Sequence, residues 1–275
     1  MALITVDENK CARDGICVEV CPAAVLALDS EGLPTVKRGG EDYCIKCGHC
    51  VAVCPYGALD NVNSPLSAQF PIPSGFPVAP ETAAVFLRSR RSVRRYTEEP
   101  IPRDLMLKLL DIARFAPSGH NTQGLSYLIV EGREPLDLVR GVVLDWMGEV
   151  VRTRPEIATL YNFPAVIHAH AKGRDQLLRG APHLIVAHAP KSLGAAQVST
   201  FLALEYVELY APALGVGTCW AGYVQRCAVE SPALGRTLGI SADHAITGIL
   251  MAGYPQYTYH RLPDRNPLDA AWLGG

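Results

Sequence analysis

The chain has 275 residues, of which 49% are hydrophobic and 19% are charged, and its formal net charge is −2. These values are ordinary for a globular protein of one or two domains. Because the net charge is close to zero, no overall positive field favours nucleic acid or an anionic membrane as a partner. The first residues contain no basic segment, and no run of about 18 apolar residues occurs. We therefore expect no secretory signal, no membrane span and a cytoplasmic location.

Cysteine spacing is the strongest signal near the N-terminus. Seven of the nine cysteines lie between residues 11 and 54, at short and repeated spacings. In a chain without a secretory signal, such clustering indicates metal ligation rather than disulfides. Residues 11–22 and 44–55 are two copies of one motif, 33 positions apart, and each copy ends in Cys-Pro. We infer an internally duplicated small domain.

The second copy reads Cys-x-x-Cys-x-x-Cys-x-x-x-Cys-Pro, the run that holds iron–sulfur clusters in bacterial two-cluster ferredoxins. Residues 1–60 resemble that family, and the duplication with its Cys-Pro endings disfavours a pair of zinc knuckles. The resemblance implies two clusters with separate ligand sets. One set is Cys44, Cys47, Cys50 and Cys21, and the other is Cys11, Cys17, Cys54 and Asp14.

Asp14 stands where the ferredoxin family has a cysteine, which gives the second cluster two interpretations. A carboxylate is a harder donor than a thiolate and a weaker ligand for iron in such a site. Asp14 is either an exchangeable ligand of a [4Fe–4S] cluster, or it binds no metal and the site holds a [3Fe–4S] cluster. The sequence is compatible with both.

A proline-rich segment separates this region from the rest of the chain. Between Asn61 and Pro80 there are five prolines and no charged residue. This composition favours a stiff, extended connector over a helix or a flexible spacer. We therefore predict a two-cluster ferredoxin domain at residues 1–62, a linker at 63–80 and a second domain at 81–275.

The second domain alternates helical and extended patterns, so the fold class is α+β. The run 183–189 is nearly all apolar, which predicts a strand buried on both faces. The segment 194–214 is apolar nearly all round, and we expect it to lie between two subunits of a homodimer. The predicted elements are a helix at 102–115, strands at 125–130 and 183–189, a helix at 194–214 and a strand at 245–253.

Residues 88–95, here called the arginine segment, contain five arginines in eight positions. Taken alone, they indicate a phosphate-binding site, a nucleic-acid patch or a solvated helix face. Three further segments follow in order: residues 116–123, 215–223 and 253–265. Together the four segments resemble the nitroreductase superfamily of FMN enzymes over roughly residues 82–270. The resemblance implies a mixed antiparallel sheet flanked by helices, in a dimer-forming domain that binds FMN.

The resemblance also implies roles for individual residues. Those that hold the FMN phosphate and ribityl chain are Arg90, Arg91, Ser92 and Arg94, and Arg261 closes on the same phosphate. Those that reach the flavin bound mainly by the partner subunit are Pro117, Ser118, Asn121 and Gln123. Those whose backbone lies along the isoalloxazine ring are Cys219, Trp220, Ala221 and Gly222. No side chain is assigned as catalytic, because the flavin carries the chemistry.

Residues 140–180 match the superfamily poorly, and we interpret them as a variable lid that sets substrate choice. His168 and His170 lie in this region. Because no cysteine or acid stands beside them at ligand spacing, we expect a lid or solvent role rather than a metal site.

The predicted activity follows from the two domains. Stand-alone nitroreductases take hydride from NAD(P)H, but a tethered ferredoxin module favours entry of single electrons through the clusters. We expect electrons to pass from the clusters to FMN and then to a small organic acceptor: a nitroaromatic, a quinone or an activated double bond. External ferredoxin or NAD(P)H would be the donor. The alternative is an electron-transfer adaptor, in which clusters and FMN relay electrons to another protein.

Overall fold

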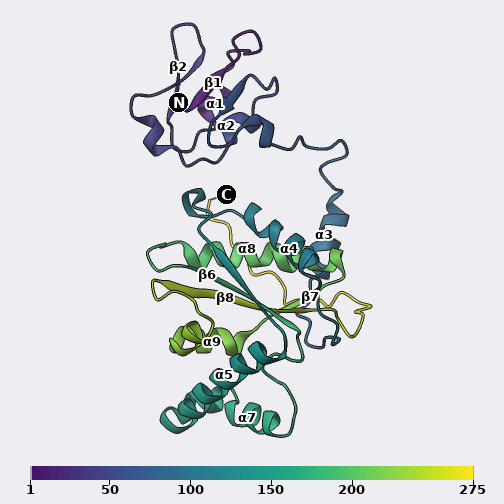
Figure 1. Ribbon diagram of the computed structural model, residues 1–275. Coiled ribbons are helices and arrows are strands. Elements are labelled where there is room, and N and C mark those ends of the chain that lie inside the picture. Colours follow the sequence, from purple (N-terminus) through teal and green to yellow (C-terminus); the bar gives the residue numbers. More distant parts are fainter. Residues whose placement is uncertain (1, 275) are drawn as a thin grey trace. The chain divides into compact units, whose positions relative to one another are not determined.

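The computed structural model describes residues 2–274 and divides into two compact units. The first unit runs up to Val78 and includes Gly119–Thr122, and the second contains Ala79–Ser118 and the chain from Gln123 onward. Figure 1 shows the elements of both units. The division after Val78 falls inside the proline-rich segment.

The first unit is built from two short antiparallel ribbons and two single-turn helices. Strand β1 pairs with β4, and β2 pairs with β3. Gly15 and Gly48, at φ 76° and 72°, each precede one of the helices, which repeats the internal duplication in the backbone. The elements are β1 (Ile4–Val6), α1 (Ile16–Glu19), β2 (Leu26–Leu28), β3 (Pro34–Val36), η1 (Gly40–Tyr43), α2 (His49–Ala52), β4 (Leu59–Asn61) and η2 (Leu66–Ala68).

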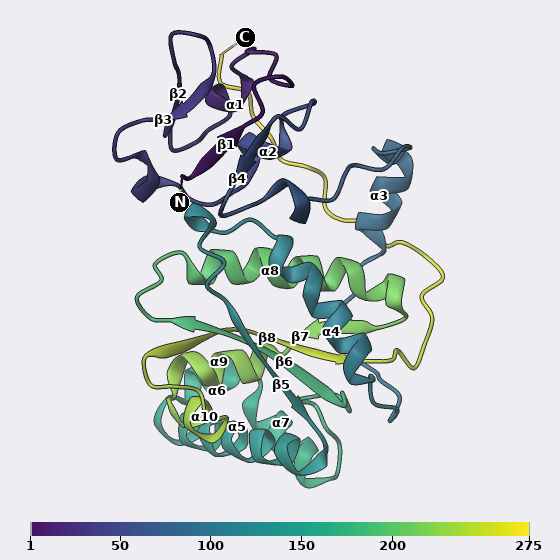
Figure 2. The same cartoon turned by 45° about the horizontal axis from the view of Figure 1, so that its top comes forward.

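The second unit is a four-stranded antiparallel sheet between two layers of helices. The strand order is β5-β6-β8-β7. Figures 1 and 2 show α4 and α8 on one face of this sheet, with α5, α7 and α9 on the other. The elements are α3 (Pro80–Ser89), α4 (Arg103–Asp111), η3 (Ile112–Phe115), η4 (Gly119–Asn121, in the first unit), β5 (Ser126–Glu131), α5 (Arg133–Thr153), α6 (Pro155–Leu160), α7 (Phe163–Ala171), β6 (His183–Pro190), α8 (Ala196–Tyr210), η5 (Ala211–Leu214), β7 (Gly217–Trp220), α9 (Gly222–Glu230), α10 (Ala233–Thr237) and β8 (His244–Gly253).

Strand β6 is the centre of the core because its two faces pack into two different hydrophobic clusters. Ile185 joins the cluster that contains Leu204 of α8, whereas Leu184 joins the cluster that contains Val143 of α5. Residues 183–187 of this strand are all buried. The prediction of a strand buried on both faces is therefore confirmed.

The other predicted elements of the second unit are found close to their expected limits. The three strands begin and end within one residue of the predicted positions. The helix predicted at 102–115 begins at Arg103 and changes to a 3-10 turn at Ile112. The helix predicted at 194–214 is α8 followed by η5.

The lid prediction for residues 140–180 is wrong for its first third. Helix α5 runs to Thr153, and its Val143, Met147 and Val150 are at most 1% exposed in the main core of the domain. These apolar residues recur at helical spacing and cover the sheet, so they belong to the core rather than to a lid. His168 and His170 are exposed on α7 and, at a spacing of two, do not face each other.

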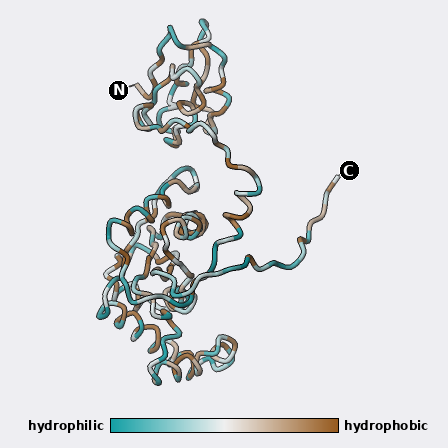
Figure 3. The backbone as a smooth tube through the Cα atoms, turned by 90° about the vertical axis from the view of Figure 1, so that its right-hand side faces the viewer, coloured by the Kyte–Doolittle hydropathy of each residue, from teal (hydrophilic) through white to brown (hydrophobic). Residues whose placement is uncertain are grey.

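Beyond β8 the chain leaves the sheet as an extended tail. Figure 3 shows this tail running away from the rest of the second unit. Its Leu268, Trp272 and Leu273 are at least 90% exposed. None of the helices within residues 2–274 has the length and apolar character that crossing a membrane requires.

Candidate functional site

The arginine segment lies directly against β7. Ser92 forms an isolated parallel bridge with Thr218, and the Val93 amide donates to the Thr218 carbonyl oxygen at 2.8 Å. Gly217 makes this approach feasible, since a Cβ atom there would lie 2.6 Å from Val93 Cγ2. The backbone contact brings the predicted phosphate-binding residues beside the strand whose end is predicted to face the flavin ring.

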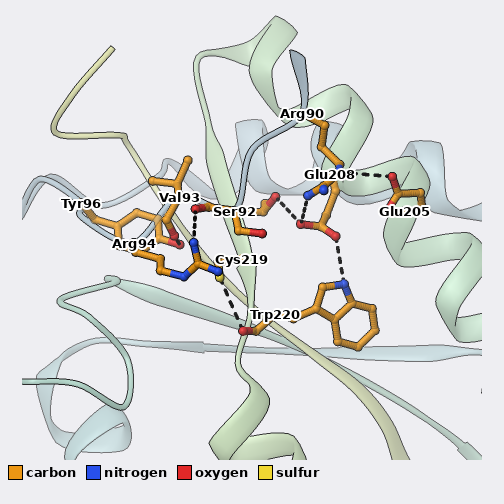
Figure 4. A network of polar contacts seen from close by, with 10 residues as sticks. Arg90, Ser92, Val93, Arg94, Tyr96, Glu205, Glu208, Cys219 and Trp220 are labelled. Carbon is orange, nitrogen blue, oxygen red and sulfur yellow. Dashed lines mark hydrogen bonds and ion pairs between the residues drawn. The ribbon is translucent and has the colours of Figure 1, made fainter. Parts of the chain in front are cut away.

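A buried carboxylate ties the same two segments together (Figure 4). The Glu208 side chain on α8 is 1% exposed and accepts from Arg90 Nη1 at 3.3 Å. It also accepts from Trp220 Nε1 at 2.9 Å and from Thr218 Oγ1 at 3.4 Å. Burial raises the pKa of Glu208, although the charge of Arg90 acts in the opposite direction. Arg90 is further paired with Glu205 at 3.4 Å.

A second group of side chains surrounds Cys219 on β7. Burial raises the pKa of the Cys219 thiol, while the nearby positive charges of Arg94 and Arg179 oppose the rise. The thiol donates to the Trp220 carbonyl oxygen at 3.5 Å, as drawn in Figure 4. Tyr96 is buried beside this group, and its hydroxyl donates to Val93 O at 2.7 Å. Cys219 is therefore held as a neutral thiol, with the charge of Glu208 adding to the rise in its pKa.

A hollow of about 390 Å³ opens beside the arginine segment and the backbone of residues 215–218. Arg91, Glu208 and Tyr259 contribute to its lining. Arg91 lies 5.5 Å from the centre of the Tyr259 ring, and its Nε atom is buried without a hydrogen-bond partner among the described residues. A buried cationic donor without an acceptor fits a bound anion, so the hollow suits a phosphate group.

The remaining predicted flavin residues lie elsewhere in the chain. Ala221 is buried and its amide donates to Ile249 O at 2.9 Å, and Gly222 begins α9. The other five positions lie within residues 117–123 or on the tail. Ser118 Oγ accepts from the Gln123 amide at 3.1 Å, Pro117 precedes it in the same loop, Asn121 Nδ2 in the first unit donates to Ile45 O and Lys46 O, and Arg261 is exposed on the tail. None of these hydrogen bonds joins the five positions to the arginine segment.

Four of the seven cysteines of the first unit line one cavity. Its walls include Cys21, Cys44, Cys47 and Cys50, the same four residues that the ferredoxin resemblance assigns to one cluster. None of the cysteines is in a disulfide. Within residues 2–274 no three His, Cys, Asp or Glu side chains converge closely enough to hold a single metal ion. Four thiols around a cavity instead fit the donor set of an iron–sulfur cluster.

The other three cysteines and Asp14 belong to the same unit. Cys17 is buried, and Cys54 Sγ accepts from the Ala58 amide at 3.3 Å. Asp14 Oδ1 accepts from the Ile16 amide at 3.3 Å, so the carboxylate hydrogen-bonds to the backbone two residues further along the chain. This contact is compatible with either interpretation of Asp14.

The comparisons with known proteins identify both parts of the chain. The model of the nitroreductase family matches residues 87–254, and the model of a 4Fe-4S dicluster domain matches residues 3–55. The chain belongs to the nitroreductase family. Both resemblances inferred from the sequence are thereby confirmed, and the chain is an oxidoreductase with an N-terminal iron–sulfur domain.

Several relatives of this nitroreductase-family chain are known. The NADH dehydrogenase of Thermus thermophilus is 27% identical over 200 residues, which are 66% of this chain and 91% of that protein. The iodotyrosine deiodinase of Thermotoga neapolitana is 26% identical over 146 residues, 48% of this chain and 68% of that protein. A nitroreductase of Desulfitobacterium hafniense, solved with bound FMN, superimposes with a TM-score of 0.56 at 20% identity, covering 70% of this chain and all of that one. That likeness shows the shared fold.

Two residues of the site were missed by sequence reasoning. Glu208 had a readable signal, because Glu205 and Glu208 are the only charged residues between Lys191 and Arg226. An acid in a largely apolar helix requires a partner where it is buried, and the arginine segment supplies one. Arg179 had no such signal, because its effect on Cys219 depends on a loop whose path the sequence does not reveal.

Proposed function

We propose that this chain is an FMN-dependent oxidoreductase in which electrons from the iron–sulfur clusters pass to FMN and reduce a small organic acceptor. Nitroaromatics, quinones and activated double bonds are the acceptor classes that we infer. The observation that carries the proposal is the presence of a dicluster domain and a nitroreductase domain on one chain. A covalent tether keeps an electron donor at high effective concentration beside its acceptor, about millimolar for a short linker.

FMN is supported by the fit between its phosphate and the residues of the second unit. Nitroreductases of the same fold from Desulfitobacterium hafniense and Bacteroides fragilis were solved with FMN bound. In this chain the residues that would hold FMN are Arg90, Arg91, Ser92, Arg94 and Arg261, with the backbone of Cys219, Trp220, Ala221 and Gly222 against the ring. The partner subunit would contribute Pro117, Ser118, Asn121 and Gln123. Bound FMN would supply both one- and two-electron redox chemistry.

The protein residues would bind and position rather than react. The Cys219 thiol has a pKa raised by burial, so it remains protonated near neutral pH and is a poor nucleophile. Glu208 is occupied by three hydrogen-bond donors and holds the arginine segment against β7. These contacts support a site in which the protein fixes geometry and charge while the cofactor carries the electrons.

Arg94 offers a direct test of FMN binding because its neighbour Arg95 is a matched control. Both side chains are exposed, but the charge of Arg94, unlike that of Arg95, acts on the nearby Cys219 thiol and opposes the rise that burial causes in its pKa. Losing one charge-assisted hydrogen bond costs about 1.5–3 kcal/mol. We expect Arg94→Gln to raise the Kd for FMN by about ten- to a hundredfold, and Arg95→Gln to leave it unchanged. Equal effects from both variants would contradict a specific role for Arg94.

A homodimer is supported by the exposed face of α8. Phe201 is 50% exposed and Val198 is 63% exposed, whereas Ala203 on the far side of the helix is 2% exposed. We infer that a second copy of the chain covers this apolar face, as its sequence predicts. Phe201→Glu should yield monomers in light scattering, while Leu138→Glu, at a 56% exposed site on α5, should not. Monomeric wild-type protein would refute this inference.

The electron path is tested by following the flavin absorption band under anaerobic conditions. In parallel titrations the protein receives NADH, NADPH or a reduced low-potential ferredoxin. Rapid bleaching by ferredoxin supports entry through the clusters. The variant Cys47→Ser, which removes one proposed cluster ligand, should slow this bleaching, whereas Tyr43→Phe, at a 74% exposed position nearby, should not. Fast bleaching by nicotinamides alone would overturn the proposed path and favour the adaptor hypothesis.

A further inference from the structure

The internal duplication places different side chains at one matched position of the two cysteine motifs. A shift of 33 residues maps Cys17 onto Cys50 and Gly15 onto Gly48. The same shift maps Leu28, the last residue of β2, onto Asn61, the last residue of β4. The two halves therefore share their backbone conformation around the cysteine motifs, but the matched strand ends carry an apolar leucine in one half and a polar asparagine in the other.

Asn61 is a buried amide directed at a cluster ligand. Asn61 is only 4% exposed, and it lines the cavity together with Cys21, Cys44, Cys47 and Cys50. Asn61 Nδ2 donates to Cys50 Sγ at 3.9 Å. Its Oδ1 accepts from the Asn63 amide at 2.9 Å. Because a backbone amide can only donate, this second contact fixes the oxygen towards Asn63 and the amide nitrogen towards the sulfur.

Leu28 provides no equivalent donor. It is 44% exposed, and its Cδ1 lies 3.4 Å from the position of a Cβ added to Gly15. An aliphatic side chain cannot hydrogen-bond a thiolate. The other N–H···S contacts of the first unit, within the described residues, come from backbone amides, such as Ala58 to Cys54 and Val51 to Cys50. Asn61 is thus the donor that a side-chain substitution can remove.

We propose that Asn61 is a positioning and tuning residue that raises the reduction potential of the cluster held by Cys44, Cys47, Cys50 and Cys21. A hydrogen bond to a ligand sulfur stabilises the more negative, reduced form of a cluster more than the oxidised form. The effect is large where the donor is buried, because water cannot compensate for it. The inference rests on the proposed cluster ligands but not on the direction of electron flow to FMN.

Anaerobic redox titration of the full chain, followed by electron paramagnetic resonance, tests this proposal. Asn61→Leu copies the side chain of the other half, and Asn61→Asp keeps the shape of the side chain but removes the donor. With iron content unchanged, each should move one of the two cluster reduction steps to lower potential. We expect about a tenfold lower reduced-to-oxidised ratio at a fixed potential, which is 59 mV for one electron.

Leu28→Asn is the reciprocal variant. It should not change the potential of the reduction step that the Asn61 variants move. Unchanged potentials in both Asn61→Leu and Asn61→Asp, or an equal shift of both steps in either variant, would overturn the proposal. If the potential moves as expected but reduced clusters fail to bleach the flavin, the tuning role of Asn61 stands and the proposed electron path fails.

Discussion

Replacing Gly217 by alanine tests the close packing between the arginine segment and β7. A Cβ atom at Gly217 would lie 2.6 Å from Val93 Cγ2 and 2.9 Å from both Val93 Cβ and Pro255 Cγ. Carbon atoms pack best at about 3.5–4.0 Å, so Val93 would have to retreat by roughly 1 Å. Val93 is only 7% exposed and its amide is bonded to the Thr218 carbonyl at 2.8 Å, which leaves it little room.

We expect Gly217→Ala to lower the free energy of unfolding of the second unit by about 1–3 kcal/mol, the usual cost of overpacking. If about 1 kcal/mol of this strain weakens FMN binding, the Kd for FMN rises about fivefold. Urea unfolding followed by tryptophan fluorescence and FMN titration of flavin-free protein measure the two effects. Gly141→Ala is the control, because its added Cβ meets nothing within 4 Å on α5; it should stabilise the helix by about 0.5–1 kcal/mol. Wild-type stability and affinity in Gly217→Ala would refute the packing argument.

Three further outcomes are expected. Asp175→Asn should lower the free energy of unfolding in urea by about 1–3 kcal/mol, because the carboxylate accepts from three loop amides. The control variant is Asp137→Asn, at a side chain that is 56% exposed. Burial would raise the pKa of Asp175, but its hydrogen bonds and the positive charge of a neighbouring arginine outweigh this and lower the pKa below 3.8. The Asp175 carboxylate therefore contributes its full share of the folding stability above pH 3.8, and this share is lost as the pH falls further. The stability of the wild type should decline more steeply in acid than that of Asp175→Asn. Glu208→Gln should lower the free energy of unfolding by about 1–3 kcal/mol. Glu205→Gln, at a half-exposed side chain, should lower it by less than about 0.5 kcal/mol. Removing the iron with a chelator should unfold the first unit and leave tryptophan fluorescence unchanged, because all three tryptophans lie in the second unit.

The parts of the chain that the sequence predicted well are those whose signals are local. Cysteine spacing depends only on residues within a dozen positions, and the structure brings Cys44, Cys47 and Cys50 to one cavity with Cys21. The strand around Ile185 was readable because burial on both faces demands a continuous apolar run. Such signals need no knowledge of the distant parts of the fold.

The misread and missed parts depend on contacts between distant segments. Helix α5 carries apolar residues at 139, 143, 147 and 150, which is a helical stripe, yet weak likeness to the family was taken as a sign of a lid. The pair of Arg90 and Glu208 joins residues 118 positions apart. No periodicity connects such residues, and only the packing of α8 against the sheet brings them together.

The buried position of Glu208 helps to fix the arginine segment through contacts within the protein itself. An unpaired carboxylate at 1% exposure is costly, so folding favours the arrangement in which Arg90, Thr218 and Trp220 all donate to it. That arrangement fixes the segment and the end of β7 relative to each other. We expect a ligand that uses both to spend less of its binding energy on ordering side chains. We therefore expect Glu208→Gln to weaken FMN binding as well as stability.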